Sequence, residues 1–272
     1  MLDALQFEFM RNALAAGLLA SIACGVIGTL VVVNRIVFIS GGIAHAAFGG
    51  IGLAFFLGFS PLFGAIGFAV ALGVIMALIA VTRPERADTV VGVLWATGMA
   101  LGILLLDLAS GYNVDLMSYL FGSILAVPGS DLWLMVILNI LIIGVVFFFF
   151  KEYLALSYDE EFAGLMGVPV RLLTIILYVL IACSVVIVIR VVGLILVIAF
   201  FTIGPYIAEK FSRSLKVMML ISVGLNCFFT IVGLIISYQF NITSGASIIL
   251  VAAFFFFATE ILFRIFRMKK TG

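Results

Sequence analysis

The chain has 272 residues, of which 66% are hydrophobic and 10% charged, and its net charge is +1. This composition excludes an ordinary soluble domain. The net charge says nothing about partners, and we expect no nucleic acid among them. A helix needs about 20 apolar residues to cross a bilayer, and runs of that length recur from end to end. The sequence therefore predicts an all-α, polytopic transmembrane bundle with a single domain over residues 1–272.

Breaks between the apolar runs predict nine membrane spans. They cover about 10–33, 41–58, 62–82, 89–109, 131–150, 172–190, 192–209, 217–238 and 246–266. The break near Arg190 is the weakest, so eight spans is the main alternative. A further apolar piece at 116–127 is too short to span the membrane. We interpret it as a short outer helix, either interfacial or re-entrant.

The basic residues predict the orientation. If 151–171 is cytoplasmic, the outer side holds only Arg11 and Arg190, which leaves twelve basic residues inside. The twelve are Arg35, Arg83, Arg86, Lys151, Arg171, Lys210, Arg213, Lys216, Arg264, Arg267, Lys269 and Lys270. This positive-inside bias favours an outer N-terminus and an inner C-terminus. An eight-span chain would put the last two cytoplasmic clusters outside, which argues for keeping the break near Arg190.

The second predicted span carries the only histidine of the chain, His45. On a helix, Gly42, Gly49 and Gly52 share its face. Glycine strips let helices approach closely, and they also leave room beside His45 for a guest. Polar groups at membrane depth usually face the bundle interior or a water-filled path. The sequence leaves two hypotheses: His45 lies on a permeation path, or it packs against a neighbouring helix.

Two further residues have an ordinary and a functional interpretation. Asp115 precedes the short apolar piece, so it is either the N-cap of that helix or a contact on the substrate path near the outer mouth. Pro205 follows Gly204 inside the seventh span, where a proline removes a backbone hydrogen bond. The resulting kink is either a gate hinge or a packing bend.

The polar stretch 151–171 interrupts the apolar runs, and we expect a short amphipathic helix over 158–166. Asp159, Glu160 and Glu161 supply the acidic first turn that a helix N-terminus favours. Phe162, Leu165 and Met166 share one face, and Gly167 ends the helix. The stretch is either a solvated loop or a docking element for a cytoplasmic partner.

The sequence lacks the motifs that several kinds of protein chemistry require. The sequence has no phosphate-binding glycine loop with lysine, so we expect ATP to be bound by another chain. It has no second histidine and no paired carboxylates inside a predicted span. We therefore expect neither a metalloenzyme nor any resident cofactor. Channels are not excluded by composition, but a channel has no need for an acidic docking helix.

Four stretches resemble the membrane subunits of bacterial ABC importers for zinc and manganese, the family 3 metal permeases. They are Gly-Ile-Ala-His-Ala at 42–46, Val-Asp-Leu-Met-Ser-Tyr-Leu-Phe-Gly-Ser at 114–123, Phe-Ala-Gly-Leu-Met-Gly at 162–167, and Val-Gly-Leu-Ile-Leu-Val with Gly-Pro within 192–205. The resemblance covers nearly the whole chain. It implies a bacterial cytoplasmic membrane protein that pairs with itself, docks a cytoplasmic ATPase and accepts metal from an extracytoplasmic binding protein.

The resemblance also assigns roles to individual residues. It makes the 158–167 segment the coupling helix and matches His45 to the histidine of the family's second span. Family members commonly have aspartate one turn before that histidine, whereas this chain has Gly41. The resulting hypothesis is a non-enzymatic permease of an ATP-driven importer for a divalent metal ion, zinc or manganese, with His45 as metal contact. The alternatives are an ABC permease for a metal chelate or other small solute, and an ATPase-independent channel or secondary carrier.

Overall fold

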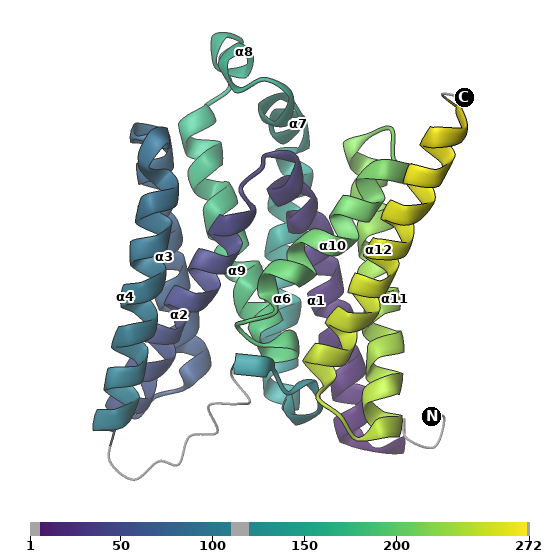
Figure 1. Cartoon of the computed structure of the whole chain (residues 1–272). Coiled ribbons are helices and arrows are strands. Elements are labelled where there is room, and N and C mark those ends of the chain that lie inside the picture. Colours follow the sequence, from purple (N-terminus) through teal and green to yellow (C-terminus); the bar gives the residue numbers. More distant parts are fainter. Residues whose placement is uncertain (1–5, 110–119, 271–272) are drawn as a thin grey trace.

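The computed structural model describes residues 6–109 and 120–270, which are helical and contain no strand. Figure 1 shows a bundle of long, roughly parallel helices. They are α1 (Glu8–Val33), α2 (Val37–Leu57), α3 (Pro61–Thr82), η2 (Pro84–Arg86), α4 (Ala87–Leu108), η3 (Ile124–Ala126), α6 (Gly129–Phe148), α7 (Phe150–Tyr158), α8 (Glu160–Leu165), α9 (Val170–Val192), α10 (Val197–Phe211), α11 (Leu215–Phe240) and α12 (Ser244–Lys270). The predicted all-α polytopic bundle is confirmed.

Eight of the described helices are long and apolar enough to cross a membrane. The predicted seventh span at 192–209 is wrong in length, because α10 begins only at Val197 and has 15 residues. Fifteen helical residues extend about 22 Å, less than the bilayer core of about 30 Å. Gly193, with φ +80°, ends α9, so the break near Arg190 is real. Eight long helices and one shorter one thus replace nine full spans.

The two ends of the chain lie at opposite ends of the bundle. In Figure 1, α1 begins at the lower end, whereas α8 and the end of α12 lie at the upper end. The loop between α3 and α4, with Arg83 and Arg86, and the turn after α1, with Arg35, also lie at the end of α8. The basic residues therefore gather where the positive-inside rule places the cytoplasm.

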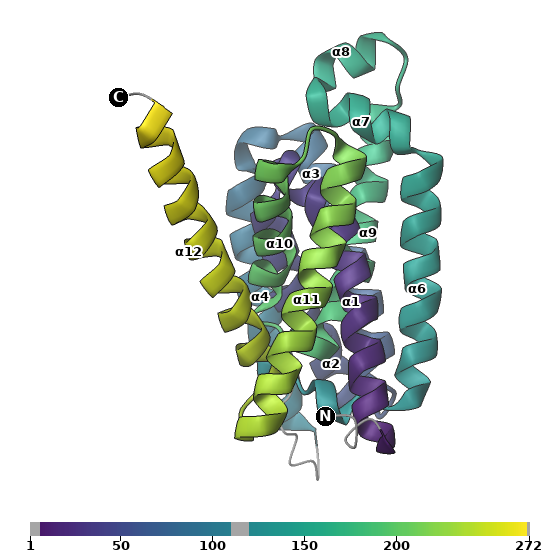
Figure 2. The ribbon, with the colours of Figure 1, turned by 90° about the vertical axis from the view of Figure 1, so that its right-hand side faces the viewer.

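The centre of the bundle is formed by α1, α2 and α9. Within their most apolar windows, 67%, 83% and 72% of the residues are buried, against 17% for α12. Figure 2 shows α6 at one edge and α12 leaning away from the bundle toward the C-terminal end. The exposed side chains of these outer helices are large and apolar, including Phe147 on α6 and Phe254 on α12. Such surfaces suit contact with lipid.

The outer segment departs from the predicted short helix at 116–127. Residues 110–119 lie outside the described part, which includes Asp115. A continuous helix through residue 127 is wrong, because Gly122 has φ +76° and only the short η3 follows. Here the chain meets the break after α9: the Ile195 amide donates to the Leu120 carbonyl at 3.2 Å.

Two ion pairs join helices within the described residues. Arg190 on α9 pairs with Asp131 at the start of α6. Lys210 on α10 pairs with Glu260 on α12, so the C-terminal half of α12 is tied to the bundle. Both pairs connect neighbouring helices, as partly buried charges in a membrane bundle require.

Candidate functional site

His45 lies near the middle of α2 and is 7% exposed. Its imidazole stacks on the indole of Trp95 from α4, with ring centroids 4.2 Å apart and planes 9° apart. The Nδ1 atom is buried and has no hydrogen-bond partner among the described residues. A histidine that only packs would normally have this atom satisfied. The ring is therefore held by one face, and its Nδ1 is enclosed without a hydrogen-bond partner. The role of His45 as a metal contact stays a prediction.

The glycine strip of α2 is packed against α4. A Cβ atom added at Gly49 would lie 3.0 Å from the Gly98 carbonyl oxygen, and one at Gly52 would lie 2.7 Å from the Gly102 Cα atom. A Cβ at Gly42 would collide with the side chain of Val91. The expectation of close helix approach is confirmed, whereas the expected free room at these glycines is wrong. Their assignment to a substrate path stays a prediction.

Gly41, one turn before His45, faces α10. An added Cβ atom there would collide with the side chain of Ile198. The position at which relatives of the resembled family commonly have aspartate is thus occupied by an apolar neighbour. Any oxygen ligand beside His45 must come from another position, a second copy or water.

The proline of α10 is packed tightly. Pro205 is buried within α10, and a Cβ added at Gly28 of α1 would lie 3.0 Å from its Cγ atom. Gly204 faces the amide of Asn226 on α11, where an added Cβ would lie 2.9 Å from Cγ. Because proline has no N–H, the i−4 carbonyl of Phe201 loses its helical donor. The hinge role of Pro205 stays a prediction.

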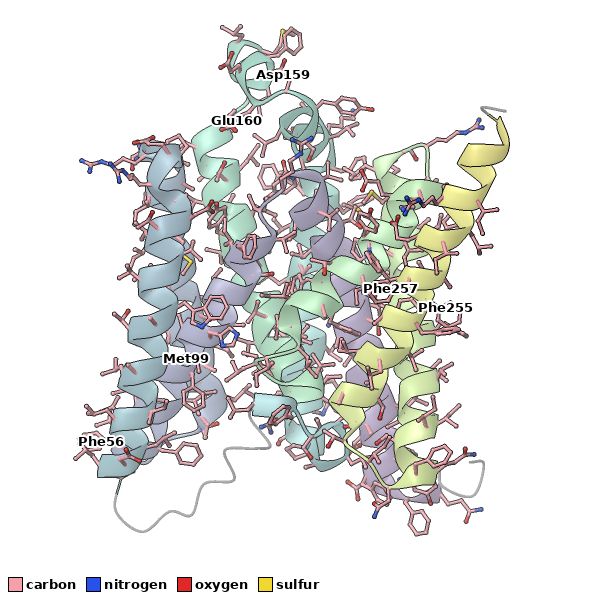
Figure 3. All side chains as sticks on the ribbon, in the orientation of Figure 1. Phe56, Met99, Asp159, Glu160, Phe255 and Phe257 are labelled. Carbon is pink, nitrogen blue, oxygen red and sulfur yellow. The ribbon has the colours of Figure 1, made fainter. Side chains whose placement is uncertain are left out.

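The segment predicted to couple the permease to its ATPase forms α8, a six-residue helix that extends beyond the bundle (Figure 3). The predicted start at residue 158 is wrong, because Tyr158 ends α7 and Asp159 is extended, with φ −157°. Asp159 is the N-cap, and its carboxylate accepts from the Phe162 amide at 2.9 Å. Gly167, with φ +83°, follows the helix as expected.

The apolar face of α8 points to solvent. Phe162, Leu165 and Met166 are 60%, 86% and 70% exposed, while Ala163 on the inner face is buried. The acidic side chains of Glu160 and Glu161 are exposed as well. Three exposed apolar side chains at the tip of a short capped helix form a surface suited to a partner groove.

The residues predicted for the path and for coupling are not one cluster. His45 lies inside the bundle and α8 at the end where α12 finishes, while Asp115 is outside the described residues. Sequence reasoning missed Trp95, although it is one of only two tryptophans. In the part of the chain that is described, no three residues among His, Cys, Asp and Glu form a metal-binding group.

Comparison with known families and proteins points to one class. Residues 6–263 match the family described as the ABC 3 transport family. An uncharacterized membrane protein of Synechocystis is 51% identical over 253 residues, 93% of this chain and 90% of that protein. The manganese import system permease protein ScaB of Streptococcus gordonii is 33% identical over 250 residues, 92% of this chain and 90% of that protein.

Solved structures with a similar fold point to the same class of protein. PsaBC from Streptococcus pneumoniae, in complex with Fab, has a chain with a TM-score of 0.86 and 33% identity, covering 95% of this chain and 93% of that one. An inward-facing putative metal-chelate type ABC transporter gives a TM-score of 0.72 at 19% identity, over 92% of this chain and 85% of that one. The second likeness concerns the fold alone.

Proposed function

The chain belongs to the ABC 3 transport family, and on that premise we propose that it conducts manganese into the cell, with zinc as the second candidate. It is a multi-pass permease subunit of the bacterial cytoplasmic membrane and carries out no catalysis itself. ATP is hydrolysed by a separate ABC ATPase, and the permease pairs with a second copy. The cargo follows the relatives, whose names include manganese import permease.

The observation that carries this proposal is α8. A soluble helix with a formed N-cap and an exposed face of Phe162, Leu165 and Met166 has no use in a self-contained channel. Amphipathic helices insert such faces into grooves of partner proteins, and the acids of the first turn orient the contact at its rim. We assign this groove to the ATPase.

His45 is the proposed contact for the ion within the membrane. A neutral imidazole is a good ligand for transition metals, and the Nδ1 of His45 has no protein partner that would compete with an ion. Manganese also favours oxygen ligands, which a second copy, water or Asp115 would supply. A site with so few protein ligands holds an ion weakly, which suits passage better than storage. Delivery by an extracytoplasmic binding protein is part of the proposal.

Uptake by the reconstituted complex tests the function. Permease and ATPase are placed in vesicles with a binding protein, and uptake of manganese, zinc and a metal chelate is measured with and without ATP. We expect ATP-dependent manganese uptake that excess zinc reduces. If the vesicles take up the metal chelate but neither free ion, the chain is instead a permease for a metal chelate. Uptake that is independent of the ATPase would contradict the importer.

A further inference from the structure

The short turn between α1 and α2 has an unusual residue at its centre. Asn34 is the C-cap of α1, and Arg35 follows it in the left-handed region, with φ +59°. The Ile36 amide donates to the Val31 carbonyl at 3.0 Å, which is the hydrogen bond of the Schellman motif. Glycine usually takes the left-handed position of this motif, and a larger residue costs free energy there. The turn therefore depends on contacts that hold it.

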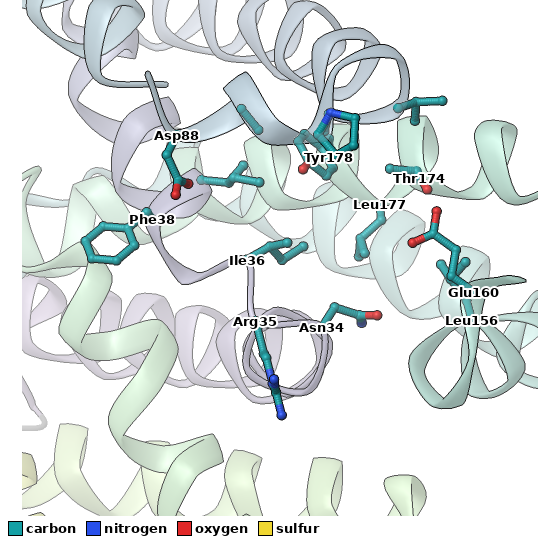
Figure 4. Close-up of a pocket in the computed structure, with 15 residues that line it drawn as sticks. Asn34, Arg35, Ile36, Phe38, Asp88, Leu156, Glu160, Thr174, Leu177 and Tyr178 are labelled. Atoms are coloured by element: carbon teal, nitrogen blue, oxygen red, sulfur yellow. The ribbon is translucent and has the colours of Figure 1, made fainter. Parts of the chain in front are cut away.

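One of these contacts comes from α7, the helix before α8. The two hydrogens of the Asn34 Nδ2 atom reach the Leu30 carbonyl at 2.7 Å and the Ser157 Oγ atom at 3.1 Å. The first bond lies within α1, whereas the second joins residues 123 positions apart. Figure 4 shows the amide of Asn34 directed toward the segment that carries Leu156 and Glu160. The amide of Asn34 thus caps one helix and ties another to it.

The inner face of α7 is fixed to the bundle. Tyr153 is fully buried, and its hydroxyl donates to the Leu173 carbonyl of α9 at 3.4 Å. Ser157 lies one helical turn after Tyr153, so both side chains share a face of α7. The helix α8 follows α7 directly, through the extended Asp159. A displacement of α8 therefore acts first on α7, and through α7 on α9 and on the turn after α1.

Packing does not fill the space between α8 and this turn. A cavity of about 270 Å³ is lined by Ile36 of the turn and by Leu156 and Glu160 of the α7–α8 segment. Side chains that face each other across such a space lack van der Waals contact, so they cannot pass a displacement on. Because Asn34 and Leu156 both line the cavity, the Asn34–Ser157 hydrogen bond lies at its edge. This bond connects what packing leaves apart.

We propose that Asn34 is a positioning residue for transport, which ties α7 to the turn that leads into α2. The proposal rests on the proposed function, in which the ATPase binds α8. Through this tie, a displacement of α8 moves the start of α2. A helix passes such a movement along its length because it is a rigid element, and α2 carries His45 in contact with Trp95 of α4. The position of the ATPase thus reaches the stacked rings.

Ser157→Ala tests the tie without disturbing the cap of α1. It removes the hydroxyl that Asn34 reaches, and alanine favours the helical state of α7. Manganese uptake and ATP hydrolysis are measured on the reconstituted permease–ATPase complex with a binding protein. We expect the ions transported per ATP to fall about fivefold, the factor that one ordinary hydrogen bond supplies, while the ATPase still co-purifies. Ser212→Ala is the matched control, because the Ser212 hydroxyl bonds only to the Glu209 carbonyl of its own helix.

A double-mutant cycle separates the tie from the cap. Asn34→Ala removes both hydrogen bonds of the amide, so it also loosens the end of α1. We expect the double variant with Ser157→Ala to transport as much per ATP as Asn34→Ala alone, because both changes break the same bond. Additive effects would show two independent roles and overturn the proposal. Unchanged transport per ATP in Ser157→Ala, an equal fall in Ser212→Ala, or release of the ATPase by Ser157→Ala would overturn it as well.

A second readout does not depend on the cargo. Trp95 and Trp133 are the only tryptophans of the chain, and Trp133 is 73% exposed on α6. In a complex with Trp133→Phe, the emission of Trp95 reports on the stacked rings, and adding Trp95→Phe gives the background from the ATPase. We expect ATP to change the Trp95 emission, and Ser157→Ala to reduce that change about twofold or more.

An equal change of emission with and without Ser157→Ala, or no change in either complex, would overturn the proposal. A normal change that Ser157→Ala reduces, in a complex that takes up no manganese, would contradict only the proposed cargo. The failure of the tie and the failure of the proposed function are therefore distinguishable.

Discussion

The imidazole of His45 lies parallel to the indole of Trp95, 4.2 Å between ring centroids, with its Nδ1 atom buried and unpartnered. Stacking fixes the plane of the ring, and Nδ1 on its edge is enclosed without a hydrogen-bond partner. It also joins α2 to α4 at the level of the glycine contacts. The histidine is thus oriented by packing, and its role as a metal contact stays a prediction.

Replacing His45 should separate a binding role from a packing role. We expect His45→Ala to reduce manganese uptake about tenfold or more, because it removes the free imidazole nitrogen. His45→Leu keeps an apolar side chain against Trp95 and should reduce uptake equally. Uptake is measured at matched protein level in vesicles. Normal uptake by His45→Leu would show that the residue only packs.

The stacking itself can be tested at Trp95. Trp95→Phe keeps an aromatic face beside His45 and should retain most uptake, whereas Trp95→Ala leaves the imidazole free to rotate. We expect a clear loss of manganese uptake for Trp95→Ala with the complex still assembled. Equal uptake by both variants would mean that the orientation of the histidine has no part in transport.

The exposed face of α8 predicts how the ATPase attaches. Phe162 is 60% exposed, so Phe162→Asp should leave the membrane bundle folded while weakening the hold on the ATPase. We expect loss of co-purification and of ATP-driven uptake. Phe162→Leu is the control, because it retains an apolar side chain of similar reach. An intact, fully active complex with Phe162→Asp would refute the assignment of α8.

The N-cap of α8 makes a finer prediction. The Asp159 carboxylate accepts from the Phe162 amide at 2.9 Å, and removing an N-cap destabilises a helix by about 1 kcal/mol. Asp159→Ala should therefore loosen α8 and reduce coupling partially, while Asp159→Asn retains most of it. Uptake per ATP hydrolysed measures the coupling. Full coupling with Asp159→Ala would mean that the partner alone shapes this helix.

The glycine contacts between α2 and α4 predict a difference in stability. A Cβ at Gly52 would lie 2.7 Å from the Gly102 Cα atom, whereas one at Gly92 on α4 meets nothing within 4 Å. Gly52→Ala should destabilise the protein by about 1–3 kcal/mol through overpacking. Gly92→Ala should be neutral or stabilising, because alanine favours helix. Thermal unfolding of the purified permease gives the comparison, and equal behaviour would contradict the close packing.

The sequence by itself determined the helical class, and it predicts the orientation and an acidic docking segment. Apolar runs long enough to cross a bilayer are compatible with few structures other than helices, since backbone groups in lipid must pair within helices. The distribution of basic residues is a property of the chain and needs no coordinates. The N-cap role of Asp159 and the stop at Gly167 are local, so spacing alone came within two residues of α8.

Only the tertiary structure decided which residues meet. His45 and Trp95 are 50 positions apart and belong to different helices, and no periodicity on one helix reveals its partner. Glycine spacing predicted close approach of another helix to α2, but it could not tell whether a helix or a substrate fills the space beside these glycines. In the structure, α4 fills it. The short α10 arises where Gly193 turns the chain against the outer segment. Asn34 and Ser157 meet for the same reason, because packing between helices brings together residues whose separation in sequence carries no signal.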